Sequence, residues 1–214
     1  MNVMTGGKLK LVQAALKLAT ETRSLTSLKL RELAREAGLN PNTFYRHFEN
    51  LDDLGLQVLG YIAAEMKAGV RQLRLVAESS EQAANTTVAF VYQYFLENKA
   101  ATTVAVRELY GSSPLLRRAL ETQLDASARE MAEDLMQRGL IPRHLTEQTV
   151  VEISHMTIRY ILFRAMDYIE KPHQREAIQQ ETERFINRQF RGATLDQLSN
   201  EEFDALVAAV RQPA

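Results

Sequence analysis

The sequence predicts an all-α protein with two parts, a small N-terminal helix-turn-helix domain and a larger helical domain that follows it. Apolar residues recur three and four positions apart along most of the 214 residues, which is the period of an amphipathic helix. Only nine Gly and five Pro occur, too few for the many tight turns of an all-β protein. The hydrophobic share of 45% is enough for a sizeable core in a soluble chain.

The beginning of the chain contains signals for three helices and a tight turn. Residues 9–22 carry apolar side chains at helical spacing, and residues 30–37 form a second, shorter helix. Gly38 suits the left-handed conformation that ends a helix. Asn40 then caps a third helix of about two turns, with Pro41 at the first position, where its missing N–H is not needed. Two short helices joined by such a turn predict a helix-turn-helix unit.

In a helix-turn-helix unit, the second of the two short helices enters the major groove of double-stranded DNA. Phe44 and Phe48 lie four residues apart and are expected to hold this helix against the core. The remaining side chains can form hydrogen bonds with phosphates or base edges. Alternatively, the segment is a helical hairpin in which the aromatic residues only pack. The predicted DNA-contacting residues are Asn40, Asn42, Thr43, Tyr45, Arg46 and His47.

Charge is distributed unevenly along the chain. Residues 1–48 hold eight Lys or Arg against three Glu, a net charge of +5. Because the whole chain carries −1, the remainder carries −6. This asymmetry is typical of a nucleic-acid-binding module joined to another domain, although short windows also fluctuate by a few charges.

The run LKLRELAREAGLNPNTFYRHFENLDDLGLQVL resembles the DNA-binding segment of the TetR family of bacterial transcriptional regulators, over roughly residues 8–60. Within that family, REAGLNPNTFYRHFENLDDLGL is most similar to regulators of unsaturated fatty-acid synthesis of the FabR and DesT type. A second segment, VRELYGSSPLLRRALETQLDASAREMAEDL, resembles their R-E-x-x-G-x-S-x-x-x-R segment. The resemblance implies a DNA-binding domain at residues 1–50 and a ligand-binding and dimerisation domain at residues 51–214, connected by a helix over residues 51–76.

Two positions depart from the family pattern. Many relatives place a Lys at the start of the helix after the recognition helix, whereas this chain has Leu51-Asp52-Asp53, and only Lys8 and Lys10 precede the first helix. Both departures predict fewer phosphate contacts, and hence a lower affinity or a shallower salt dependence. Lys29 replaces the usual Ser or Thr cap of the second helix, so either its ammonium reaches a phosphate or the cap shifts back to Ser27.

The larger domain shows helix signals throughout. Its predicted helix boundaries rest on caps and breakers: Ser113-Pro114 begins one helix, Gly139 and Gly192 end two others, and Ser199 with Glu202 forms a capping box. The predicted helices cover residues 51–76, 81–99, 102–110, 115–138, 146–167, 173–190 and the tail after Ser199.

The resemblance implies a homodimer on a palindromic operator, because two heads must address two half-sites about one helical turn apart. The 146–167 helix is apolar nearly all round, which fits burial against both its own core and a partner subunit, or else a central helix of a monomeric bundle. In the family the middle helices enclose a cavity for a small hydrophobic effector. The candidate lining residues, each of which could equally be ordinary core, are Phe90, Tyr94, Phe95, Tyr110, Met131, Leu135, Met156, Tyr160 and Phe163.

The effector expected from the resemblance is a long-chain acyl-CoA. Methionine and aromatic side chains adapt to a flexible apolar chain. Arg107, with Arg117 and Arg118, either meets the phosphates of the CoA group or is an ordinary surface charge. The expected function is a dimeric repressor of lipid-metabolism genes. Alternatives are a regulator that senses another hydrophobic molecule, as multidrug-type regulators do, and a helical protein-interaction module.

No feature of the sequence indicates an enzyme. There is no cysteine, no G-x-S-x-G elbow, no phosphate-binding glycine loop and no H-E-x-x-H motif, and the four histidines lack metal-ligand spacing. We therefore predict no catalytic residue, metal site or cofactor. The start of the chain lacks the apolar stretch of a signal peptide, and no window approaches ~18 apolar residues, so we expect a cytoplasmic protein without a membrane span.

Overall fold

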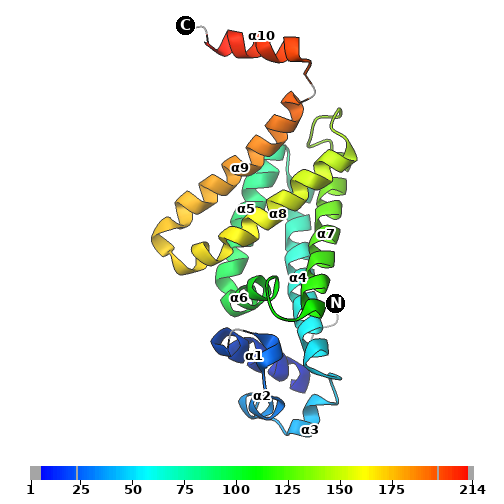
Figure 1. Ribbon diagram of the computed structural model, residues 1–214, viewed down its shortest axis with the longest axis vertical. Helices are drawn as coiled ribbons and strands as arrows, with labels where there is room; N and C mark the ends of the chain where they lie inside the picture. The colour runs from blue at the N-terminus through cyan, green and yellow to red at the C-terminus, as the bar shows by residue number, and fades with distance from the viewer. Residues whose placement is uncertain (1–5, 23, 197, 212–214) are drawn as a thin grey trace.

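The computed structural model describes residues 6–22, 24–196 and 198–211, and every regular element within these ranges is helical, which confirms the predicted all-α class. The molecule is elongated, with a small group of helices at one end and a longer bundle extending from it (Figure 1). We call the small group the head. It contains α1 (Gly6–Thr22), the short 3-10 helix η1 (Leu25–Ser27), α2 (Leu30–Glu36) and α3 (Pro41–Phe44).

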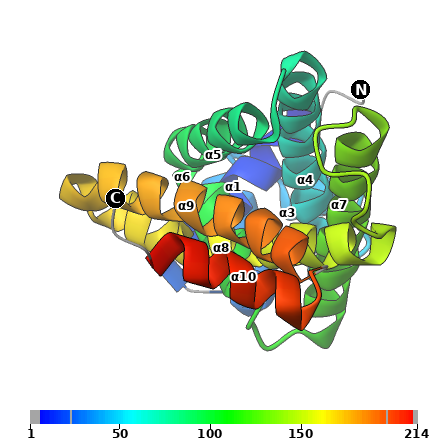
Figure 2. The same cartoon turned by 90° about the horizontal axis from the view of Figure 1, so that it is seen from above.

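The remaining helices form the body. α4 leaves the head and runs along the bundle, α7 packs against both α4 and α8, and α9 packs across α5 and α8. α10 stands apart at the end distant from the head (Figures 1 and 2). None of the helices in the described ranges has the length and apolarity needed to span a bilayer. The body contains α4 (Leu51–Val76), α5 (Ser80–Glu97), α6 (Lys99–Glu108), α7 (Pro114–Gln137), α8 (Glu147–Glu170), the 3-10 helix η2 (Pro172–Gln174), α9 (Arg175–Leu195) and α10 (Asn200–Arg211).

Local capping interactions set several of these boundaries as the sequence predicts. The Asn40 side chain accepts a hydrogen bond from the backbone N–H of Asn42 at 2.9 Å, and Asn50 accepts one from Asp53 at the same distance. Gly38 ends α2 in the left-handed region with φ 64°, which a residue with a Cβ adopts only at a cost.

The third head helix is shorter than its sequence predicts. Regular α-helix ends at Phe44, and the next residues continue as turns, in which the N–H groups of His47 and Phe48 both bond to the Phe44 carbonyl at 2.9 and 3.0 Å. The chain must become fully extended at Asn50, which has φ −158° and ψ −176°, in order to cap α4. The segment therefore unwinds before that cap.

The last body helix before the tail is longer than predicted. Gly192 was expected to end it, but α9 continues to Leu195, and Gly192 does not have a positive φ. Ala193 packs against the cluster that contains Leu135 and Val150. Tertiary packing thus outweighs the low helix propensity of one glycine.

The head and the body share one continuous core. Leu11 and Leu33 of the head pack in the same cluster as Val58 of α4, Val104 of α6 and Leu116 of α7, and all five are buried. Movement of α6 or α7 is therefore transmitted to the head through direct contact, because packed interiors leave little free space.

Two polar contacts from α6 reinforce this junction. The Arg107 guanidinium donates to the carbonyl of Thr20 at the end of α1, 3.0 Å away. The fully buried Glu108 carboxylate accepts from the backbone N–H of Leu25 at 2.7 Å and from the Ser24 hydroxyl at 3.2 Å. A Cβ on Gly111 would lie 2.6 Å from the other Glu108 oxygen, so the glycine leaves space for the buried carboxylate.

The centre of the body contains a buried tyrosine pair. Tyr92 of α5 stacks on Tyr168 of α8, with ring centroids 4.3 Å apart, and its hydroxyl forms a 2.7 Å hydrogen bond with Thr182 of α9. Burial raises the pKa of Tyr92 to about 12. The neutral phenol is therefore favoured in the folded state.

This raised pKa gives an expected loss of stability in alkali. A tyrosine in the unfolded chain titrates near 10, so the contribution of Tyr92 is complete below about pH 10 and is lost as the pH rises towards 12. We expect Tyr92→Phe to flatten the fall in the free energy of unfolding between pH 10 and 11.5, measured by urea denaturation. Tyr45→Phe, on an exposed ring, is the control and should retain the slope of the unchanged protein.

Candidate DNA-contacting surface and effector cavity

The segment that follows the tight turn of the head presents polar side chains to the outside. Asn42, Tyr45 and Arg46 are exposed, whereas Phe44 and Phe48 are buried with ring centroids 5.5 Å apart. The aromatic pair fixes the segment to the core of the head, as the sequence predicts. The exposed side chains are therefore available to a partner, and Tyr45 borders a hollow that Ser112 and Pro114 of the body also line.

Thr43 and His47 are only partly exposed because α1 packs beside them. A Cβ on Gly7 would lie 3.1 Å from the His47 ring and 3.4 Å from the Thr43 methyl group. An alanine at position 7 would require the His47 ring to shift by a few tenths of an ångström. Both side chains therefore help to seat the segment against α1 in addition to the DNA contacts predicted for them.

The two remaining residues predicted to contact DNA lie at helix starts. The Asn40 side-chain oxygen is engaged as the cap of α3, so this residue positions the segment. Lys29 is exposed at the N-cap of α2 and forms no side-chain cap. The shift of the cap to Ser27 is wrong, because the Ser27 hydroxyl donates to the Ser24 carbonyl at 2.8 Å. The Lys29 side chain thus remains exposed at the start of α2.

An elongated cavity runs through the body between α4, α5, α7 and α8, with α6 at one end and α9 along one side. Its wall is almost entirely apolar. Along α4 the lining extends from Leu59 to Val70, roughly 16 Å at 1.5 Å per residue. Such a space suits a long, narrow apolar molecule. Its apolar wall includes Ile62, Met66, Phe95, Leu109, Met131 and Leu162.

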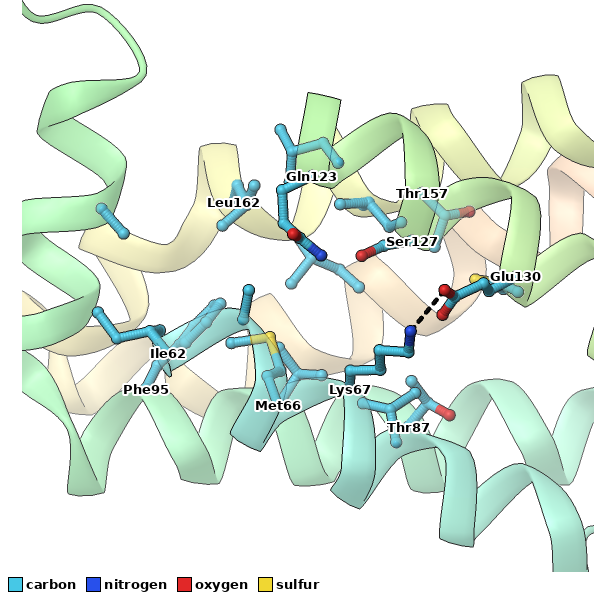
Figure 3. Close-up of a pocket in the computed structure, with 18 of the residues that line it drawn as sticks. Ile62, Met66, Lys67, Thr87, Phe95, Gln123, Ser127, Glu130, Thr157 and Leu162 are labelled. Atoms are coloured by element: carbon cyan, nitrogen blue, oxygen red, sulfur yellow. Dashed lines mark hydrogen bonds and ion pairs between the residues drawn. The ribbon is translucent and has the colours of Figure 1, made fainter. Parts of the chain in front are cut away.

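The polar lining residues gather around one part of this cavity. Lys67 of α4 and Glu130 of α7 form an ion pair across it, 2.5 Å long, and Gln123 and Ser127 extend from α7 into the same space (Figure 3). The Lys67 and Glu130 side chains are 43% and 39% exposed, so this end of the cavity lies at the surface. Sequence reasoning missed the pair because the two residues are 63 positions apart and neither carries a motif.

The residues predicted to line an effector cavity are widely separated. Phe95, Met131 and Leu135 lie on its wall. Phe90 packs over Gly69 of α4, and the Tyr94 hydroxyl donates to Glu65, which together with burial raises its pKa. Tyr160 stacks on Phe185 at 4.1 Å.

The other residues predicted to bind the effector lie away from this cavity. Tyr110, Met156 and Phe163 are 83%, 53% and 76% exposed, and none of them lies on the cavity wall. They project from the loop after α6 and from the outer face of α8, a distinction that apolar composition alone does not make. Arg107 contacts the head and does not face the cavity.

Comparison with known proteins finds a sequence family that matches the head and solved structures that share the fold of nearly the whole chain. Residues 11–58 match the family model described as bacterial regulatory proteins, tetR family. The fold of nearly the whole chain is shared with FadR from Bacillus halodurans, with a TM-score of 0.72 at 15% identity over 87% of this chain and 96% of that one. FadR from Bacillus subtilis in complex with stearoyl-CoA has a TM-score of 0.70 at 14% identity, over 86% and 98%. A TetR-family regulator from Bordetella parapertussis has a TM-score of 0.64 at 13% identity, over 90% and 97%.

A helix-turn-helix head joined to a larger helical body is the architecture shared with these solved structures. The head therefore carries the sequence pattern of the tetR family over residues 11–58, and nearly the whole chain shares the fold of the solved FadR structures.

Proposed function

We propose that this chain is a homodimeric transcriptional repressor whose affinity for a palindromic operator is set by a long-chain acyl-CoA in the body cavity, and that it controls genes of fatty-acid metabolism. The observation that carries the proposal is the elongated apolar cavity with polar groups at its exposed end. An acyl chain matches the apolar wall, and a thioester with its CoA group matches a polar, open end.

The similarity to a FadR solved with stearoyl-CoA agrees with this ligand class, although the two chains are only 14% identical. The FabR and DesT resemblance of the recognition segment points to the same area of metabolism. The ligand class therefore rests on the chemistry of the cavity first and on relatives second.

The position of α6 gives the effector a route to the DNA-binding head. Ala105 and Leu109 line the cavity, while Arg107 and Glu108, between them, hold the head. A ligand that displaces Ala105 and Leu109 therefore also moves Arg107 and Glu108. Its differential affinity for the two arrangements then sets the affinity for DNA.

Fluorescence anisotropy on a labelled duplex from upstream of the gene tests the proposal. We expect tight binding that weakens with salt and that changes at least tenfold on addition of palmitoyl-CoA or oleoyl-CoA. If the affinity for the duplex does not change with any acyl-CoA, the chain is still a DNA-binding regulator, but this effector class is excluded. If this duplex is not bound, selection from genomic fragments decides whether the head binds DNA, and failure there excludes the repressor.

The outer face of α8 supports a dimer. Met156, Arg159 and Phe163 recur at spacings of three and four, and all three are exposed. Two large apolar side chains on one helical face are costly in water unless a partner covers them. A second copy related by a two-fold axis covers this face with the same face of its own α8.

We expect Phe163→Asp to convert the dimer to a monomer, because the change places a charge at the centre of the proposed interface. Sedimentation velocity at micromolar concentration measures the mass. Val76→Asp makes the same kind of change at an exposed site at the end of α4, and it should leave the dimer intact. A Phe163→Asp variant that still sediments as a dimer would exclude this face.

A further inference from the structure

Three uncharged polar side chains on the cavity wall have unused hydrogen-bonding groups. Within the part of the chain that the structure describes, the side chains of Gln123, Ser127 and Thr157 have no hydrogen-bond partner. Thr157 is only 2% exposed, and its hydroxyl is buried. A buried hydroxyl without a partner costs free energy, so Thr157 indicates a ligand with a polar atom of its own, and the partly buried Gln123 and Ser127 offer further hydrogen-bonding groups on the same wall.

The two ends of the cavity differ in chemistry and in exposure. Towards one end the Lys67–Glu130 pair reaches the surface, with Gln123 and Ser127 near it (Figure 3), and an apolar lining that includes Val70 and Leu135 continues past the pair. At the other end lie Leu59 of α4, which is 6% exposed, and Phe95 of α5, which is 1% exposed. This second end is closed, apolar and adjacent to α6.

We propose that the effector is a single-chain amphiphile bound in one orientation, with its carbonyl group beside Gln123 and Ser127, its head group between Lys67 and Glu130, and its chain end against α6. This inference rests on the proposed function. It adds the orientation of the ligand in the cavity and the residues that select its head group. The Gln123 amide and the Ser127 hydroxyl donate to the carbonyl oxygen. Lys67 leaves Glu130 and pairs with the negative charge of the head group. Within the described residues, Lys67 and Glu130 are the only charged residues on the cavity wall, and this pairing explains why a cation lies there.

The same orientation makes α6 the sensor of chain length. The small side chain of Ala105 lies at the closed end, next to the residues that hold the head. A chain long enough to reach this end contacts α6, and a shorter chain does not. Chain length therefore determines whether a bound ligand changes DNA affinity.

Binding of palmitate and of hexadecanol, which differ only in the head group, tests the orientation by isothermal titration with the full-length protein. We expect Lys67→Met to weaken palmitate about tenfold or more and to leave hexadecanol within about twofold, since only palmitate carries a charge. Glu130→Gln should strengthen palmitate, because it removes the competing carboxylate. Glu121→Gln, at an exposed position on the same helix, is the matched control and should change neither.

The closed end is tested separately with Ala105→Phe. We expect this variant to lose palmitoyl-CoA binding at least tenfold while it retains octanoyl-CoA binding, because the added ring shortens the cavity. Thermal unfolding of each variant identifies any loss of fold, and Ala105→Leu provides a smaller change of the same kind if the phenylalanine is not tolerated. For Ala105→Leu we expect the same preference for shorter acyl chains, with a smaller change in affinity.

The outcomes separate the inference from the proposed function. If acyl-CoA binds the unchanged protein but Lys67→Met weakens palmitate and hexadecanol equally, the orientation is wrong and the proposed function stands. If Ala105→Phe alters the preference between ligand head groups and not between chain lengths, the ligand lies in the reverse direction. If no acyl compound binds the unchanged protein, both are overturned.

Discussion

Arg46→Ala is expected to weaken operator binding by about 30-fold or more. Arg46 is exposed on the recognition segment, and a lost arginine contact to a base or phosphate costs about 1–3 kcal/mol. A dimer loses the contact twice, a total of about 2–6 kcal/mol. Anisotropy titration at a fixed salt concentration measures the change.

The control for this variant is Arg143→Ala, which removes the same charge from the exposed loop between α7 and α8, distant from the head. Its operator affinity should remain within about twofold. Equal losses in the two variants would mean that only net charge matters, and no loss in Arg46→Ala would mean that the segment does not contact DNA. Sedimentation of both variants verifies that the dimer is unchanged.

Glu108→Ala is expected to destabilise the protein by about 3 kcal/mol and to weaken the response of DNA binding to the effector. The change leaves the buried N–H of Leu25 without an acceptor and opens a cavity between α6 and the head. The free energy of unfolding comes from urea denaturation, and the response comes from operator affinity measured with and without palmitoyl-CoA.

Glu108→Gln separates the two effects, because its side-chain oxygen can still accept from Leu25 and its volume is nearly the same. We expect it to recover most of the stability and most of the response. A Glu108→Ala variant that retains full stability and a full response would show that the contact between α6 and η1 carries neither. A variant that loses stability but retains the response would confine Glu108 to a structural role.

The sequence by itself determined the elements whose causes are local. The caps at Asn40 and Asn50, the left-handed Gly38 and the aromatic pair at positions 44 and 48 all act within a few residues, so their pattern is legible along the chain. The capping box of Ser199 and Glu202 is present in the structure for the same reason. Together these signals gave the helix-turn-helix head and most boundaries of the body.

The ends of α3 and α9 were harder to predict from the sequence because interactions outside the local segment set them. α3 ends early because the next helix needs an extended cap, and α9 passes Gly192 because Ala193 packs against another part of the body. Single-residue propensities of about 1 kcal/mol or less do not decide such ends against tertiary packing.

Only the tertiary structure decided which side chains form the cavity. α8 is apolar nearly all round, so its sequence does not indicate that Thr157 faces the cavity while Met156 and Phe163 face outward. The Lys67–Glu130 pair joins residues 63 positions apart, and Glu108 meets Leu25 from 83 positions away. These contacts depend on how whole helices pack against one another, and that arrangement is a property of the complete fold, not of any local pattern.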